Sequence, residues 1–415
     1  MDTRESSVLI RVNFVVISLL NFLLCFGAHG DALDHWTTNN FNNLSLGYLG
    51  ENPSGNCGAV AIEYGNGRYV AVGYYAGSDF GFIESSEDGL GWTVRGDGHS
   101  IPGTPLTMEL FSVTFGNGTF VAVGYDAYFG ANLYSSTNGI DWKSHTNATV
   151  SNFYGVAYGG GSFAAVGDGF LPSTSSYPQT NRNIYTSTDG INWTIRNSGA
   201  PANDAHTITD IAYGVGRFVA VDFLGYSYTT TTGISWTRHF IGGGPSVSYG
   251  NGLFISPIGS GTNLVSSDGL AWSVLTNNTA SMFGRVVYGN GLYIAPSRFS
   301  LFTSIDGTNW VQRNFPSTGG SAVAFGTRNA VVVGSSSAAV LASDPFVALS
   351  MNPGFPPHLN LSGLQDHSYR IECLANLSPT NWQPLATFSL TNSPLEWMDT
   401  AASNSQRFYR ATLLP

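Results

Sequence analysis

The sequence predicts an all-β protein built from repeated units of four strands, and three observations support this. A turn phrase, Ser187-Thr188-Asp189-Gly190-Ile191-Asn192-Trp193 in its clearest copy, recurs along most of the chain. A second phrase, in which an Asn-Gly turn interrupts an apolar run, precedes the copies of the first. Charged residues make up only 10% of the chain, whereas aromatic residues make up 13%, so the chain can build a large core.

The turn phrase joins two strands through a tight turn. Its Ser and Asp side chains can bond backbone amides inside the turn, and its glycine supplies the positive φ. The tryptophan that begins the next strand carries a large apolar surface for burial. We therefore predict that these repeated residues are structural and belong to no catalytic or sugar-binding site. They are Asp88, Asp189, Asp268, Asp306, Trp36, Trp92, Trp142, Trp193, Trp236, Trp272 and Trp310.

The second phrase carries the Asn-Gly signal of a β-hairpin. It is clear in Ile62–Gly73 and Val113–Gly124, and its seventh copy is Val323–Gly334. Each unit therefore consists of strand, Asn-Gly turn, strand, variable loop, strand, aspartate turn and a fourth strand. Four strands at a period of roughly 36–55 residues predict the blade of a β-propeller.

The last unit lacks its fourth strand, and a matching strand lies near the N-terminus. No tryptophan follows Asp344-Pro345, whereas Asp34–Asn39 resembles the strand after each aspartate turn. We expect the segment around Trp36 to pair with the strand near Ala338–Ser343, which would remove an exposed sheet edge. The predicted fold is a seven-bladed β-propeller over residues 31–346, closed by this N-terminal strand. A small C-terminal β-sandwich-like module over residues 347–415 follows it.

Two stretches resemble known families. The turn phrase resembles the Asp-box, or bacterial neuraminidase repeat, of secreted seven-bladed β-propellers, but it has one residue fewer between Asp and Gly. This resemblance covers roughly residues 31–346, and the family includes sialidases, xyloglucanases and proteins that only bind. The C-terminal phrase from Tyr369 to Leu385 resembles a small β module of large secreted proteins from Verrucomicrobia-type bacteria, and it implies no function.

The N-terminus has the features of a secretory signal peptide. Arg4 and Arg11 precede an apolar run from Val12 to Phe26, and a cleavage site follows near Gly30. We predict a cleaved signal over residues 1–30 and a secreted or extracytoplasmic protein. The mature chain is expected to have no membrane span and to be a monomer. The net charge of −10 argues against nucleic acid as a partner.

The distribution of long loops indicates a binding face. The loops between second and third strands, and those between blades, are long in the first blades and share one face, where a rigid scaffold often binds its partners. Acids that break the repeat lie beside them. We predict a glycan or an extracellular protein as the ligand over blades 1–4. The predicted contact residues are Asp126, Asp168, Asp222, Tyr74, Tyr125, Arg182 and His206.

The predicted function is binding without catalysis. No catalytic residue, metal site or cofactor is predicted, because the sequence shows no nucleophile motif, no His/Cys metal cluster and no phosphate loop. Two other functions stay open. A glycoside hydrolase acting on polysaccharides is the first, since carboxylates beside aromatic rings suit paired acid–base catalysis. A scaffold for envelope assembly is the second.

Overall fold

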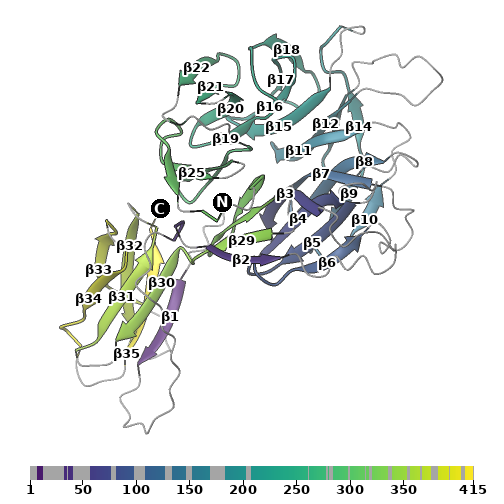
Figure 1. Cartoon of the computed structure of the whole chain (residues 1–415). Helices are drawn as coiled ribbons and strands as arrows, with labels where there is room; N and C mark the ends of the chain where they lie inside the picture. Colours follow the sequence, from purple (N-terminus) through teal and green to yellow (C-terminus); the bar gives the residue numbers. More distant parts are fainter. Residues whose placement is uncertain are drawn as a thin grey trace. The chain divides into compact units, whose positions relative to one another are not determined.

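The computed structural model of the chain consists of β-strands and turns in the residues that it describes (Figure 1). These residues are 7–12, 32–34, 36–40, 57–75, 81–97, 108–126, 133–145, 152–168, 183–201, 207–259, 261–276, 279, 284–297, 300–313, 315–316, 320–334, 339–352, 356–364, 367–374, 382–391, 393–402 and 407–414. No helix among them is long and apolar enough to cross a membrane. The chain divides into two compact units, residues 38–326 with 331–341, and residues 1–37 with 327–330 and 342–415.

Six antiparallel four-stranded sheets follow one another along the described part of the larger unit, arranged around a common centre (Figure 1). In each sheet the strands pair in chain order. The sheets are β3–β6 (Cys57–Gly65, Arg68–Tyr75, Gly81–Ser86, Thr93–Asp97), β7–β10 (Met108–Gly116, Thr119–Asp126, Leu133–Ser136, Lys143–His145), β11–β14 (Phe153–Gly159, Ser162–Gly167, Ile184–Ser187, Thr194–Arg196), β15–β18 (Ile208–Gly214, Arg217–Asp222, Tyr226–Thr230, Thr237–Phe240), β19–β22 (Ser248–Gly250, Leu253–Gly259, Thr262–Ser266, Ser273–Thr276) and β23–β26 (Val287–Gly289, Leu292–Pro296, Leu301–Ser304, Val311–Arg313).

A seventh four-stranded sheet joins the two ends of this series. It contains β27 (Ala322–Phe325), β28 (Ala330–Val333) and β29 (Ala339–Ser343), and its fourth strand is β2 (Trp36–Asn40), which pairs with β29. This confirms the pairing that the sequence predicts for the segment around Trp36. The side-chain amide of Asn39 donates to the carbonyl of Leu90 in the aspartate turn of the first sheet. The N-terminal strand therefore links the last sheet to the first.

The smaller unit contains two sheets around one core. A three-stranded sheet has β30 (Val347–Asn352), β31 (His358–Gly363) and β34 (Leu395–Met398), and a four-stranded sheet has β32 (Ser368–Leu374), β33 (Gln383–Ser389), β35 (Arg407–Leu413) and β1 (Ser7–Val12). Leu359, Tyr369 and Tyr409 are among the residues buried between these strands. Strand β1 lies inside the predicted signal segment, residues 1–30, and pairs antiparallel with β35.

Each of the seven sheets packs on the next through a glycine and an aromatic ring. A Cβ added at Gly65, Gly116, Gly159, Gly214, Gly250 or Gly289 would overlap the ring of Phe115, Tyr158, Tyr213, Tyr249, Tyr288 or Phe325, respectively. At Gly326, directly after β27 of the seventh sheet, the overlapping group is the hydroxyl end of Tyr69 in β4 of the first sheet. The contacts thus run through all seven described sheets and return to the first. Only glycine lets the ring approach the backbone so closely.

The same aromatic rings begin a stack that reaches the outer strand of their own sheet. In the third sheet, Tyr158 packs on Phe163 at a centroid distance of 4.7 Å, and Phe163 packs on Trp193 at 6.4 Å. The equivalent rings pack in the same way in four other sheets. The stacks give these five sheets a continuous apolar layer from centre to edge.

The aspartate turn holds the tryptophan end of this stack. Asp189 Oδ1 accepts hydrogen bonds from the backbone N–H groups of Asn192 and Ile191, each at 2.8 Å, and Ser187 Oγ accepts from Gly190 N at 2.9 Å. The indole N–H of Trp193 donates to the carbonyl of Gly190 at 3.2 Å. The hydrogen bonds from Asn192 and Ile191 hold the pKa of Asp189 well below its usual range, because they favour the ionised carboxylate.

The glycine–ring contact predicts the effect of a single methyl group. Gly159→Ala is expected to lower the free energy of unfolding by about 1–3 kcal/mol, the range for overpacking a core, because the methyl would overlap Tyr213. Chemical denaturation followed by circular dichroism measures this loss. Gly91→Ala is the matched control, since a Cβ there meets only Asp88 Oδ1 at 3.9 Å. Equal losses for the two variants would contradict tight packing at Gly159.

One core position of the first sheet holds a carboxyl group. Glu84 in β5 is fully buried, and neither of its carboxyl oxygens has a hydrogen-bond partner among the described residues. At the same repeat position, counted back from the aspartate turn, other sheets have Tyr134, Tyr185 and Leu264. All three of these residues are buried. Burial raises the pKa of Glu84 to about 8, because the ionised form would lose its hydration without compensation.

Glu84 therefore predicts a dependence of stability on pH. The folded state keeps the proton up to about pH 8, whereas the unfolded chain releases it near its ordinary pKa of 4.5. The free energy of unfolding should thus fall as pH rises through this window. Glu84→Leu should raise the melting temperature more at about pH 8.5 than at about pH 5, as differential scanning calorimetry can measure. An equal gain at both pH values would contradict this origin.

Candidate functional site

A cavity of about 420 Å³ lies where the first strands of the seven sheets converge. Its lining residues fall within 60–63, 111–114, 154–158, 209–213, 245–249, 285–288 and 322–325. Most of these side chains are apolar or small hydroxyl groups. The charged side chains in the described lining are Glu63, Asp210 and Arg285, so these three set the electrostatics of the cavity.

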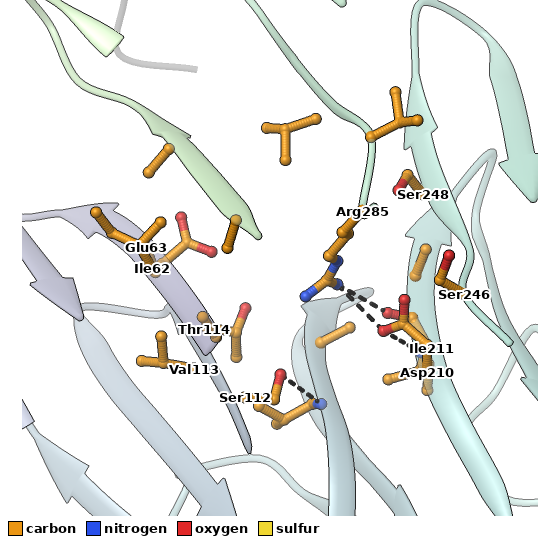
Figure 2. A pocket seen from close by; sticks show the side chains of 18 of the residues that line it. Ile62, Glu63, Ser112, Val113, Thr114, Asp210, Ile211, Ser246, Ser248 and Arg285 are labelled. Carbon is orange, nitrogen blue, oxygen red and sulfur yellow. Dashed lines mark hydrogen bonds and ion pairs between the residues drawn. The ribbon is translucent and has the colours of Figure 1, made fainter. Parts of the chain in front are cut away.

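Arg285 and Asp210 form an ion pair inside the cavity (Figure 2). Arg285 Nη2 lies 3.5 Å from Asp210 Oδ1 and donates to the carbonyl of Ile211 at 3.3 Å. The carboxylate of Asp210 also accepts from the backbone N–H groups of Ile211 at 2.9 Å and Val247 at 3.1 Å. Burial raises the pKa of Asp210, although the Arg285 charge and these amides oppose the rise. The charges of the Arg285 guanidinium and the Asp210 carboxylate therefore already compensate each other.

Glu63 faces the same cavity from the first sheet (Figure 2). Its carboxylate accepts one hydrogen bond, from the N–H of Tyr64 at 3.0 Å, and it has no ion-pair partner within the described ranges. Burial raises the pKa of Glu63 to about 7, while the amide of Tyr64 and the more distant charge of Arg285 lower it. Burial therefore favours the protonated form of the Glu63 carboxyl group more than water does.

Three aromatic side chains gather at one end of the cavity, where the long loops of the first three sheets begin. Phe111 and Tyr154 line the cavity and stack with a centroid distance of 5.4 Å and an interplanar angle of 23°. Tyr74, near the end of β4, meets Phe111 edge-on at 6.1 Å. We call these residues the mouth cluster. All three are partly exposed, so the cluster offers ring surface beside the cavity.

Two of the predicted acids are buried and hydrogen-bonded within their own sheets. Asp168 accepts from the backbone N–H of Asn152 at 2.9 Å and from its side-chain amide at 2.6 Å. Asp222 accepts from the N–H groups of Leu224 and Tyr226, each at 2.9 Å, and from the hydroxyl of Tyr228 at 2.8 Å. These bonds shape the adjoining turns. That either acid also contacts a ligand stays a prediction.

The other predicted residues divide into two groups. Tyr74 belongs to the mouth cluster, and Tyr125 and Asp168 lie close enough to Tyr154 to help raise its pKa, after the larger effect of burial. The structure thus places Tyr125 and Asp168 near Tyr154, while Tyr74 contacts Phe111. The side chain of Asp126, together with Arg182, His206 and most of the long loops, lies outside the described residues.

The sequence prediction missed the charged residues of the cavity. Glu63 stands two residues before the glycine of its first strand, where the other sheets have Thr114, Ala157, Ala212, Ser248, Val287 and Ala324. A charge among small residues at one repeat position was the available signal for Glu63. Four residues before the same glycine, the two charges Asp210 and Arg285 stand where the other sheets have Ala61, Ser112, Gly155, Ser246 and Ala322. Across the described chain, no group of three or more His, Cys, Asp and Glu side chains is placed to hold a metal ion.

The fold has structural counterparts, whereas no protein-family model and no curated protein sequence matches the chain. YCF48 bound to D1 peptide has a TM-score of 0.54 at 15% identity, covering 76% of this chain and 99% of that one. Virginiamycin B lyase from Staphylococcus aureus has 0.55 at 11% identity, covering 74% and 98%. The Pan2 WD40 domain of Neurospora crassa has 0.51 at 8% identity, covering 75% and 95%. The likeness establishes that this chain has a β-propeller fold.

Proposed function

We propose that the chain is a secreted, non-catalytic binding protein whose ligand, a glycan or an extracellular protein, lies over the mouth of the central cavity. The observation that carries this proposal is the mouth cluster, Tyr74, Phe111 and Tyr154, at the end of a concave site with few charged groups. Exposed ring faces beside a mostly apolar cavity, with a small number of polar groups for orientation, are typical of binding sites.

The proposal includes a finer architecture. The seven sheets would be the blades of one closed propeller of the Asp-box type over residues 31–346, after removal of a signal over residues 1–30. The series of glycine–ring contacts that returns to the first sheet supports the closed ring. Residues 347–415 would form a separate C-terminal module, and the shared core of its two sheets supports this.

A protein ligand has some support from the structural neighbours. YCF48 was solved with D1 peptide bound, and its chain is covered almost completely by this fold at 99%. The bound peptide of YCF48 favours a peptide ligand here. Because the likeness concerns the fold alone, it does not indicate where such a ligand would bind.

Glycoside hydrolysis is the second candidate, because Glu63 and Asp210 bring two carboxyl groups with raised pKa values into one cavity. A hydrolase of this kind needs one carboxyl group as the acid and another as nucleophile or base. The engagement of Asp210 by Arg285 and two amides argues against either role for it.

The mouth cluster predicts which variant loses binding. The full chain would be screened on glycan and peptide arrays, and the affinity for the strongest ligand would be measured by calorimetry. Tyr154→Ala should weaken binding by about ten-fold or more, equivalent to at least about 1.4 kcal/mol, because a stacked ring is lost. Phe240→Ala is the matched control, since this residue is 70% exposed on the outer strand of the fourth sheet.

Three outcomes would count against the proposal. Unchanged affinity in Tyr154→Ala would place the ligand elsewhere. Binding by a fragment of residues 347–415 alone would assign the function to the smaller unit. If chromatography shows that shortened sugars are released from a bound polysaccharide, the result would favour the hydrolase.

A further inference from the structure

We propose that the central cavity receives a cationic group of a protein ligand, the side chain of a lysine or arginine, beside Glu63. This inference rests on the proposed function, since it names what enters the cavity beneath the mouth cluster. It also decides between the two ligand classes in favour of a peptide, because most glycans carry no cationic group.

The described cavity lining holds two carboxyl groups, Glu63 and Asp210, and one cation, Arg285. Arg285 is paired with Asp210 at 3.5 Å, and its other hydrogen bond in the described structure goes to the carbonyl of Ile211. Glu63 faces the cavity with one backbone hydrogen bond and no ion-pair partner among the described residues. The Glu63 side chain is partly buried, so its carboxylate has lost part of its hydration and favours the arrival of a positive charge. The cavity therefore has a place for one further cation.

Hydroxyl groups lie at the same level of the cavity as Glu63. Thr114 and Ser248 occupy the same repeat position on the second and fifth sheets, and both line the cavity. The hydroxyl of Ser248 is buried and has no hydrogen-bond partner in the described chain. An ammonium group brings three donors and a guanidinium five, so oxygen atoms beside the carboxylate suit either group.

The mouth cluster suits the rest of such a side chain. Lysine and arginine carry apolar stems that pack on ring faces while their charged ends reach a polar group. Phe111 and Tyr154 provide stacked rings that line the same cavity as Glu63. An aromatic face also attracts the cation directly, within about 6 Å of the ring centroid. A cationic side chain could therefore pass the rings and end at Glu63.

An anionic ligand fits the cavity less well. Arg285 is the cation of the described lining, and an anion would have to take it from Asp210. A neutral sugar would leave Glu63 uncompensated. The burial of Glu63, which raises its pKa to about 7, agrees with a carboxyl group that lacks a cation in the free protein.

The probe is a pair of short peptides, acetyl-Gly-Gly-Lys-Gly-Gly-amide and its Nε-acetyl-lysine counterpart, titrated into the full chain by calorimetry near neutral pH. The lysine peptide should bind about ten-fold or more tightly than the acetylated one. Glu63→Gln should abolish this preference. Glu87→Gln is the matched control, because Glu87 is an exposed acid of the same sheet that pairs with Arg68 at 2.6 Å.

Proton release gives a second readout that a merely structural role of Glu63 would not change. A cation that ionises Glu63 should release a fraction of a proton near pH 7, measured in two buffers of different ionisation enthalpy, and none in Glu63→Gln. Wild-type affinity for the lysine peptide should also rise between about pH 6 and about pH 8, because only the ionised carboxylate attracts the cation. This measurement needs no variant.

The outcomes separate this inference from the proposed function. No binding of the lysine peptide, equal binding of the two peptides, or an unchanged preference in Glu63→Gln would each overturn the cationic ligand. If Tyr154→Ala still weakens an array ligand, the binding site at the mouth stands while this inference fails. If neither residue matters for any ligand, both are wrong.

Discussion

The contact between a glycine backbone and the aromatic ring of the next sheet is the constraint on which the rest of this structure depends. A side chain at Gly159 would occupy the volume of the Tyr213 ring, and the same holds around the series to Gly326 and Tyr69. The contact fixes the distance between neighbouring sheets at their inner strands. Because the series returns to its start, each sheet is held from both sides.

The convergence of the inner strands also explains why charged groups from distant parts of the chain meet in one cavity. Residues far apart in the sequence, such as Glu63 and Arg285, line one volume because both belong to inner strands or the turns that lead into them. Charged groups are costly at such a place unless they are paired. Asp210 and Arg285 meet this condition. Glu63 does not, and that difference makes the cavity a candidate for recognition.

The sequence could predict the structural features that recur along the chain. The aspartate turn of Asp189 depends on neighbouring residues, so its hydrogen bonds follow from the local phrase. The pairing of the Trp36 segment with the last sheet followed from a missing copy at one end of the chain and a spare one at the other. In both cases the comparison of repeated copies supplied structural information that a single segment does not contain.

The candidate site was harder to predict, since it depends on features that occur once. Asp222 ends a strand and was predicted to face a ligand, yet its carboxylate turns back to Leu224, Tyr226 and Tyr228. The direction of the Asp222 carboxylate depends on the turn that follows its strand. Glu63 and Asp210 do break the repeat in the sequence, but only the meeting of the seven inner strands shows that both line one cavity. Phe111 and Tyr154 were missed for the same reason.

The central claim, that ligand binding is a property of the cavity and its mouth, is tested most directly by hydrogen exchange on the full chain. Amide exchange followed by mass spectrometry would compare the free protein with the protein saturated by its strongest array ligand. Binding at the cavity and its mouth would slow exchange in the inner strands around Glu63, Phe111 and Tyr154, with little change near the Asn-Gly turns. Protection confined to those turns, or to residues 347–415, would contradict it.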